Sequence, residues 1–181
     1  KIYSPDQKSS VGIDNGELIS YIKDEEELIH QKGEPGWRNS DTEMFPVIGP
    51  TESNGFKVNT PRGDAIQDQH GLLRELNYEL AVKGENSIVF HKKYEQNTPI
   101  KNSKYPEKST EELVAWPYSF SFSKKFRLSD NELIVEFEVE GEKDMPFMLG
   151  YHPAFKLSGN NSEKIKVKGE ELELQKILDV G

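Results

Sequence analysis

Residues 118–139 carry the sequence YSFSFSKKFRLSDNELIVEFEV, and this stretch decides the fold. Tyr118, Phe120 and Phe122 alternate with serines, and Phe126 and Leu128 keep the same parity. After a polar turn, a second run alternates aliphatic or aromatic residues with glutamates. Two alternating runs around a short polar turn predict an antiparallel hairpin with an aromatic inner face and an acidic, solvated outer face.

The same two-residue period recurs along the chain and predicts further strands. We expect them at residues 10–14, 17–23, 55–59, 77–82, 87–94 and 164–167. An Asn-Gly pair at residues 15–16, flanked by apolar residues, predicts a tight hairpin turn. We expect a long surface loop over residues 96–112 and a single short helical turn over residues 107–113. No segment has the pattern of a long amphipathic helix.

These patterns predict an all-β chain in which residues 1–181 form one domain of two packed sheets. No internal repeat and no clear linker divides the sequence. Only 34% of the residues are hydrophobic, but 9 Phe, 7 Tyr and 2 Trp supply large side chains for a core. The 30% of residues that are charged then belong mainly to the surface.

Composition also narrows the classes of partner. A net charge of −9 argues against nucleic acid and anionic membranes, because neither gains from meeting an acidic surface. The sequence has no cysteine, which excludes disulfides and thiolate chemistry and fits a reducing compartment. No apolar run reaches the length that crosses a bilayer, and no signal peptide is visible. We therefore expect a cytoplasmic location, and the oligomeric state stays open.

Two of the four histidines have local sequence that suits acid–base chemistry. His152 precedes Pro153, and proline biases the residue before it toward extended geometry, so the imidazole should be held rigidly at the end of a strand. His70 precedes Gly71, which allows a sharp turn, and Arg74 follows four residues later. Considered alone, each histidine is more often a structural residue than a catalyst. His30 and His91 lack such context, and we assign them to surface or packing roles.

Other chemistries find little support in the sequence. No pair of histidines has metal-ligand spacing, and no His-Glu-x-x-His motif occurs. The Gly-x-Ser-x-Gly motif of a hydrolase and a glycine-rich phosphate loop are also missing. Acid–base chemistry on a neutral substrate is the natural remaining use for the two histidines.

Four blocks, taken together in their order, are similar to a known family. They are MFPVIG (residues 44–49), QHGLLR (69–74), WPYSF (116–120) and GYHPAF (150–155). Over residues 12–157 the chain resembles the aldose 1-epimerase, or galactose mutarotase-like, superfamily. The branch that it most resembles contains the hexose mutarotases and the glucose-6-phosphate 1-epimerase relatives.

The resemblance implies a large antiparallel two-sheet β-sandwich with a sugar cleft on one face. It implies an isomerase that interconverts the α and β anomers of a hexose or hexose phosphate by opening and reclosing the ring. By the same resemblance, His152 is the general acid that protonates the ring oxygen, and His70 binds and polarises the same region. No cofactor and no metal is implied.

An isomerase of this kind would also need groups that hold the sugar. Arg74 and Arg38 would orient the substrate, and a phosphate would suit the arginine fork. Trp37, Trp116 or Tyr151 would offer an apolar face to the sugar ring, although core packing is the commoner role for such aromatic residues. The expected partner is therefore a monosaccharide or a sugar phosphate.

The chain departs from the family pattern at its C-terminal side. The family's general base is normally a glutamate well downstream of the position of His152, and no such residue is identifiable here. The candidates after residue 159 are Glu163, Glu170, Glu171, Glu173 and Asp179. We expect that C-terminal strands of the family are missing from these 181 residues. A sugar-binding or sensing module without turnover is therefore the alternative function, and a purely structural β-sandwich is a third.

Overall fold

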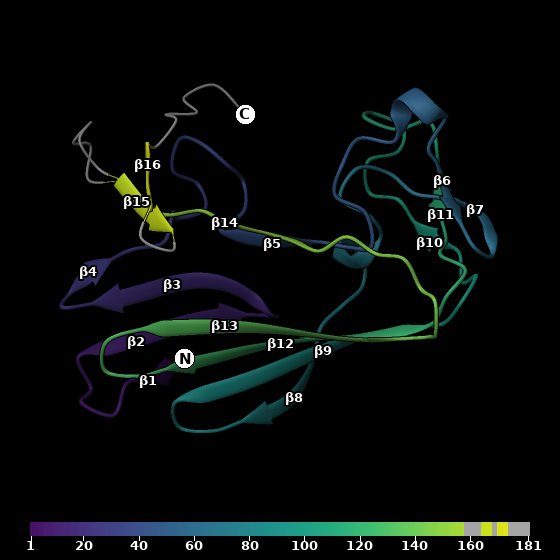
Figure 1. Ribbon diagram of the computed structural model, residues 1–181. Helices are drawn as coiled ribbons and strands as arrows, with labels where there is room; N and C mark the ends of the chain where they lie inside the picture. Colours follow the sequence, from purple (N-terminus) through teal and green to yellow (C-terminus); the bar gives the residue numbers. More distant parts are fainter. Residues whose placement is uncertain (158–163, 168–169, 174–181) are drawn as a thin grey trace.

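Antiparallel sheets form nearly all regular structure in the computed structural model, which describes residues 1–157, 164–167 and 170–173 (Figure 1). One four-stranded sheet has the order β1-β2-β3-β4, and another has the order β13-β12-β9-β8. Four smaller sheets pair β5 with β14, β6 with β7, β10 with β11 and β15 with β16. Within the described residues, no helix has the length and apolarity that crossing a membrane requires.

The elements have the following bounds. The first large sheet contains β1 (Ile2–Tyr3), β2 (Ser9–Asp14), β3 (Glu17–Lys23) and β4 (Glu26–Glu27), and the second contains β8 (Glu79–Lys83), β9 (Ser87–Tyr94), β12 (Phe120–Leu128) and β13 (Leu133–Gly141). The short strands are β5 (Asp41–Met44), β6 (Lys57–Thr60), β7 (Gly63–Ile66), β10 (Ile100–Lys101), β11 (Leu113–Val114), β14 (Gly150–Pro153), β15 (Lys164–Val167) and β16 (Glu170–Glu173). Two 3-10 turns, η1 (Glu52–Asn54) and η2 (Leu73–Glu75), are the helical elements of the described part of the chain.

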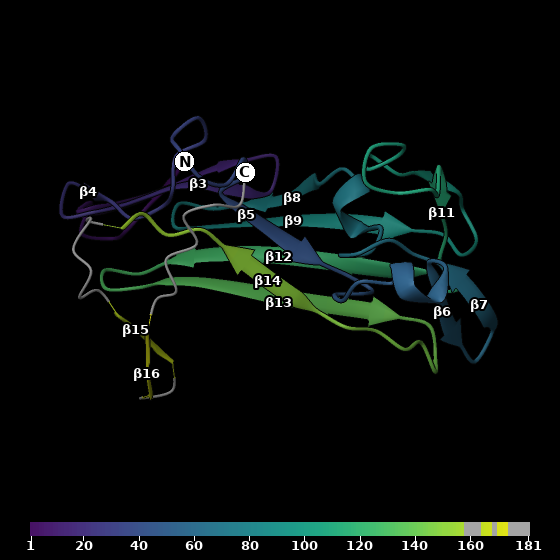
Figure 2. The same cartoon turned by 90° about the horizontal axis from the view of Figure 1, so that it is seen from above.

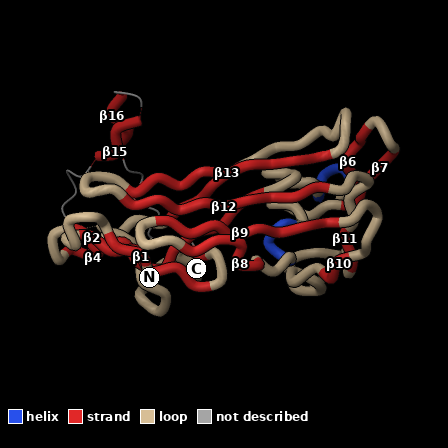
Figure 3. Tube along the Cα trace, turned by 90° about the horizontal axis from the view of Figure 1, so that it is seen from below, coloured by secondary structure: helices blue, strands red, loops and turns tan. Residues whose placement is uncertain are grey.

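The β5–β14 pair forms a layer over the second large sheet. Figure 2 shows β5 and β14 crossing over the long strands β12 and β13, which run side by side with β9 in Figure 3. Phe45, directly after β5, packs its ring 4.8 Å from that of Phe120 in β12. Tyr151 of β14 packs against Phe137 of β13 at 4.9 Å. Aromatic contacts therefore fix the short β5–β14 pair on the inner face of the long hairpin.

The hairpin predicted from residues 118–139 is confirmed. Strands β12 and β13 pair antiparallel, with Phe126 opposite Val135 and Leu128 opposite Leu133. Phe122 and Phe126 are fully buried, as the alternation requires. On β13, which is at the edge of its sheet, the outward glutamates at 136, 138 and 140 are exposed, so the acidic outer face is confirmed as well.

Most predicted strands are present with small shifts of their ends. The strands over 17–23, 87–94 and 164–167 have the expected bounds, whereas those over 10–14, 55–59 and 77–82 are displaced by one to two residues. The Asn-Gly turn at 15–16 joins β2 to β3, and both turn residues have positive φ. The all-β fold class is therefore correct.

The short helical turn expected over residues 107–113 is wrong. Leu113 begins strand β11, and the preceding loop is organised around Asn102, which is only 1% exposed. The Asn102 side-chain amide donates to the Ser109 hydroxyl at 3.1 Å and to the Glu111 carbonyl at 2.9 Å. Because Ser109 also accepts a hydrogen bond from the Glu111 amide, the segment closes as a loop rather than a helix.

A buried ion cluster connects β5 to the centre of the second sheet. The Lys124 side chain is inaccessible to solvent, and its ammonium donates to Asp41 at 2.6 Å and to Glu43. The Tyr151 hydroxyl donates to the same Asp41 carboxylate at 2.9 Å, and the Leu18 amide donates to its other oxygen at 3.1 Å. Burial raises the pKa of Asp41, while Lys124 opposes that rise. The cluster therefore joins β5 to β12 by ion pairs, and to β14 and β3 by hydrogen bonds.

Replacing Lys124 by methionine should destabilise the fold strongly, because it leaves two buried carboxylates without their cation. We expect a loss of about 3–5 kcal/mol in the free energy of unfolding, measured by urea denaturation at pH 7. The loss should shrink as the pH falls, because burial raises the pKa of Asp41 and the native state then protonates this carboxylate more readily than the unfolded chain does.

Lys125→Met is the matched control for this prediction. Lys125 pairs with Glu136 at 3.2 Å, and both side chains are about half exposed. Such a surface pair contributes about 0–1 kcal/mol. Equal effects of the two substitutions would show that the buried cluster does not stabilise the fold.

Candidate functional site

His152 is positioned by the β5–β14 ladder. It pairs with Thr42 across the two strands, in the extended conformation expected before Pro153. Its side chain is exposed, and its ring meets the edge of the Trp37 indole at 4.6 Å with an interplanar angle of 88°. Because side chains alternate along a strand, the neighbouring Tyr151 points to the opposite face. His152 is therefore presented to solvent from a rigid strand, with an aromatic ring beside it.

His70 occupies a turn that is locked onto the residue following β5. Both His70 and Gly71 have positive φ, at 75° and 66°, which confirms the sharp turn expected from the His-Gly pair. The Phe45 amide donates to the His70 carbonyl at 3.2 Å, and the Leu73 amide donates to the Phe45 carbonyl at 3.0 Å. Strand β5 thus positions both histidines. It pairs with the strand that contains His152, and the residue after its end is hydrogen-bonded to the turn that contains His70.

Electrostatics favour a neutral imidazole at position 70. Burial is the largest cause that lowers the pKa of His70, and the positive charges of Lys104, Arg74 and His152 lower it further. Asp68 acts in the opposite direction but more weakly. A neutral His70 has one ring N–H to donate and one ring nitrogen to accept. The two histidines are close enough for the charge of one to influence the other.

Two cations support the turn that contains His70. Arg74, in η2, and Lys104, from the long loop, both donate to the Gln69 carbonyl, with the Lys104 bond at 3.1 Å. Arg74 also forms a largely buried ion pair with Glu75 at 2.8 Å. Burial and the charge of Arg74 lower the pKa of Lys104. The long loop therefore places a positive charge, that of Lys104, beside His70. The sequence did not indicate this contact.

The structure gathers some of the expected site residues and separates others. His152, Trp37, His70 and Arg74 lie around β5 and the turn that follows it. Arg38 is exposed and makes no side-chain hydrogen bond or ion pair within the described residues. The Tyr151 hydroxyl is bonded to Asp41 inside the protein, away from the exposed face of His152.

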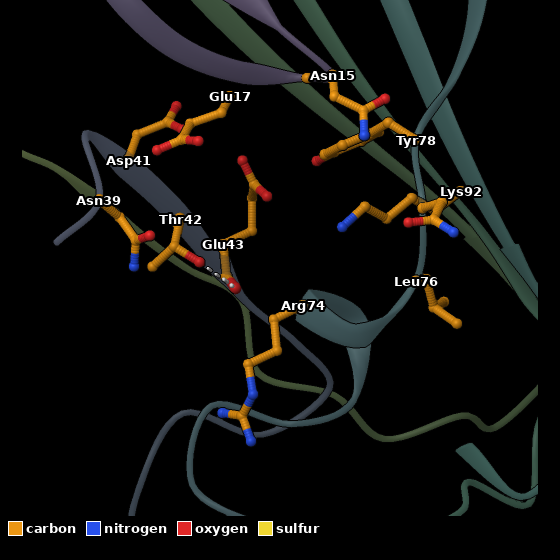
Figure 4. A pocket seen from close by; sticks show the side chains of 12 residues that line it. Asn15, Glu17, Asn39, Asp41, Thr42, Glu43, Arg74, Leu76, Tyr78 and Lys92 are labelled. Carbon is orange, nitrogen blue, oxygen red and sulfur yellow. Dashed lines mark hydrogen bonds between the residues drawn. The ribbon is translucent and has the colours of Figure 1, made fainter. Parts of the chain in front are cut away.

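A polar cavity of about 340 Å³ lies beside β5 and contains residues that the sequence did not single out (Figure 4). Its lining combines β5, η2, the β2–β3 turn, the segment between η2 and β8, and one residue of β9. The lining residues are Asn15, Gly16, Glu17, Asn39, Asp41, Thr42, Glu43, Arg74, Leu76, Asn77, Tyr78 and Lys92. Groups of acidic or histidine side chains that could hold a metal ion are not found among the described residues.

The carboxylates near His70 are already engaged. Asp68 accepts a hydrogen bond from Asn102 at 3.1 Å and lies 3.9 Å from the Lys104 ammonium. Glu75 binds Arg74 and accepts a bond from the Ser103 hydroxyl. Two of the downstream carboxylates considered as the general base, at positions 163 and 179, lie outside the described residues. A base for proton abstraction is therefore not assigned.

The fold is that of galactose mutarotase-like proteins. A galactose mutarotase-like protein from Lactobacillus casei superposes with a TM-score of 0.66 at 24% identity, covering 87% of this chain and 50% of that protein. A galactose mutarotase related enzyme from Lactobacillus acidophilus gives a TM-score of 0.62 at 22% identity, covering 86% and 51%. At these identities the likeness shows the fold.

Sequence comparison identifies the family. Residues 51–180, more than half of the chain, match the family described as Aldose 1-epimerase, and the chain belongs to that family. LacX, the chromosomal protein of Lactococcus lactis subsp. lactis, is 26% identical over 170 residues, which cover 87% of this chain and 52% of LacX. The plasmid-borne LacX of the same organism matches equally. The chain thus spans about half the length of the curated relatives that it matches.

Removing the positive charge of Lys104 should raise the pKa of His70. Lys104→Met removes the charge that, after burial, lowers the pKa of His70 most, so the imidazole should bind its proton at higher pH than in the wild type. The measurement is a pH titration of the His70 ring signals by NMR. Lys101→Met, at the exposed residue of strand β10, is the control and should leave the His70 titration unchanged. Identical titrations in both variants would contradict the electrostatic account.

Gly71→Ala should destabilise the His70 turn. A Cβ at position 71 would lie 2.3 Å from the Phe45 carbonyl oxygen, in a left-handed conformation that side chains rarely adopt. We expect a loss of about 1–3 kcal/mol or more in the free energy of unfolding, together with shifted His70 NMR signals. Gly49→Ala is the control, because an added Cβ there meets nothing within 4 Å. A variant at position 71 as stable as the one at 49 would show that the close approach is not required.

Proposed function

We propose that this chain acts as an aldose 1-epimerase-like isomerase that interconverts the α and β anomers of a hexose or hexose phosphate. The observation that supports the proposal is that strand β5 positions both histidines, in a member of the aldose 1-epimerase family. His152 lies on the strand paired with β5, and the His70 turn is hydrogen-bonded to the residue that follows β5. Two imidazoles on one rigid strand pair and its adjoining turn suit proton transfer near neutral pH. The proposed partner is the sugar, with no cofactor or metal in the reaction.

In the proposed reaction, His152 donates a proton to the ring oxygen while a base removes the proton of the anomeric hydroxyl. The ring then opens to the aldehyde, the carbonyl group rotates, and reclosure gives the other anomer. The exposed position of His152 gives its ring access to such a substrate. His70, whose pKa is lowered by burial and nearby cations, would donate a hydrogen bond from its neutral ring.

The remaining residues have supporting parts in the proposal. Trp37, whose ring contacts His152, would provide the apolar surface under the sugar. Arg74 would orient the substrate beside His70, and Arg38 is exposed and able to reach a phosphate. Tyr151 would act indirectly, since its hydroxyl bond to Asp41 holds β14 on β5 in the conformation that presents His152.

Replacing His152 should remove the catalysed part of anomer exchange. We expect His152→Ala to lower the catalysed rate by about 10²–10⁴-fold, because it removes the proton donor. Exchange between the anomers of glucose and of glucose 6-phosphate can be followed by saturation-transfer NMR, with the spontaneous rate subtracted. His91→Ala is the matched control, since His91 lies on β9 and pairs with the exposed Glu79 at 3.1 Å. A His152→Ala variant as active as the wild type would refute the assignment.

A binding module without turnover is the alternative, and one observation favours it. The described carboxylates beside His70 are already bound to Arg74, Lys104 or Asn102, which leaves the general base unassigned. The same NMR experiment separates the two functions. Sugar binding that shifts the Trp37 and His152 signals without faster anomer exchange would establish the binding module, whereas catalysed exchange would exclude it.

A further inference from the structure

Lys92 lines the polar cavity beside β5 and has no role in the proposed anomer exchange. It lies on β9 with its side chain on the inner face of the sheet, and the residue is only 5% exposed. Its ammonium donates to the Leu73 carbonyl at 2.8 Å and lies 4.1 Å from the centre of the Tyr78 ring. In Figure 4 the end of the Lys92 side chain points into the space between Tyr78 and Glu43. The amine is thus held in a fixed position at a cavity wall.

Comparison with the other buried lysine shows what is unusual about Lys92. Lys124 faces the same side of the same sheet, one strand away, but its charge is compensated by Asp41 and Glu43. Within the described residues, no carboxylate oxygen lies within 4.0 Å of the Lys92 ammonium. A neutral amine at Lys92 can keep its hydrogen bond to the Leu73 carbonyl while turning its lone pair toward the cavity. Lys92 therefore has no directly bound carboxylate in the described structure to hold its proton, whereas Lys124 has two.

The charged groups around Lys92 do not overcome its burial. Glu43 and Asp41 of β5 and Glu75 of η2 favour the ammonium form, and Lys124 of β12 opposes it. Arg74 and Glu17 also line the cavity, and the Tyr78 ring face favours a cation. Burial is the largest influence and lowers the pKa of Lys92 to about 8.

This protonation equilibrium makes a nucleophile available near neutral pH. With that pKa, about 10% of the amine is unprotonated at pH 7, against well below 0.1% for an ordinary surface lysine. Desolvated lysines of this kind are the ones that form Schiff bases with carbonyl compounds. The cavity volume of about 340 Å³ is in the range that holds small ligands, and its amide, hydroxyl and carboxylate groups suit a hydroxylated one.

We propose that Lys92 is a covalent binding site for small hydroxyaldehydes, which enter the cavity beside β5 and form an imine with its amine. The nitrogen lone pair attacks the carbonyl carbon, a C–N bond forms, and a proton passes from nitrogen to the former carbonyl oxygen. Loss of that oxygen as water, with the second amine proton, leaves the C=N bond. The step consumes one aldehyde, releases one water and involves no oxidant or reductant. It needs no anomer exchange, so it stands apart from the proposed isomerase reaction.

The test is reductive trapping of the imine in the full chain. The protein is incubated at pH 7.5 with glycolaldehyde and sodium cyanoborohydride, which reduces an imine to a stable secondary amine, and the modified lysines are located by peptide mass spectrometry. We expect Lys92 to be labelled at least about tenfold faster than Lys93, its exposed neighbour on the other face of β9. Lys124 should stay unlabelled. The labelling rate at Lys92 should level off above about pH 8.

Two further measurements test whether the fast labelling comes from Lys92 in the folded protein. Lys92→Arg preserves a cation and a donor for the Leu73 carbonyl but cannot form an imine, so the fast-labelled peptide should disappear while the circular dichroism spectrum stays unchanged. If that variant fails to fold, unfolding the wild type in urea serves instead and should bring Lys92 down to the rate of Lys93. Equal labelling of Lys92, Lys93 and Lys124 in the folded protein would overturn the proposal, as would no labelling at Lys92. Anomer exchange is measured separately, so either proposal can fail alone.

Discussion

The contact on which the candidate site depends is the buried pairing of Lys124 with Asp41 and Glu43. Strand β5 has only four residues, and such a short strand has little stability of its own. The ion cluster holds β5 against the long sheet, and β5 in turn holds β14 and the turn of His70. Because an unpaired buried charge is far more costly than a paired one, the arrangement favours a single position for β5. The geometry of both histidines thus follows from three charged side chains beneath them.

The long hairpin could be predicted from sequence because its alternation is regular and its inner positions are aromatic. Strand β5 could not, since its inward residues are Asp41 and Glu43, which an alternation argument assigns to solvent. Their burial makes sense only beside Lys124, which is 83 and 81 residues away along the chain. One feature of the sequence does predict that Lys124 is buried. Lys124 shares the parity of Phe122 and Phe126, so the register that buries those rings must bury the lysine too.

The candidate site was only partly accessible from sequence for a related reason. Pro153 and Gly71 revealed the local conformations of the two histidines, because proline and glycine restrict or permit backbone angles directly. Nothing in the sequence showed that Lys104 would reach the His70 turn from the long loop. Lys92 shares the parity of the buried Phe90 and Tyr94, so its inward direction was readable, but the cavity it meets was not. Local backbone conformation can be predicted from neighbouring residues, whereas a cavity depends on the packing of segments that are far apart in the sequence.

The acidic outer edge of the second sheet has a consequence for how copies of this chain meet. Strand β13 is the edge strand of its sheet in the described structure, with its glutamates exposed. If two copies joined β13 to β13 antiparallel about Phe137, Glu136 of each copy would stand opposite Glu138 of the other. Like charges directly opposite one another on paired strands are destabilising. The edge therefore disfavours pairing of two copies through β13 while these carboxylates are ionised.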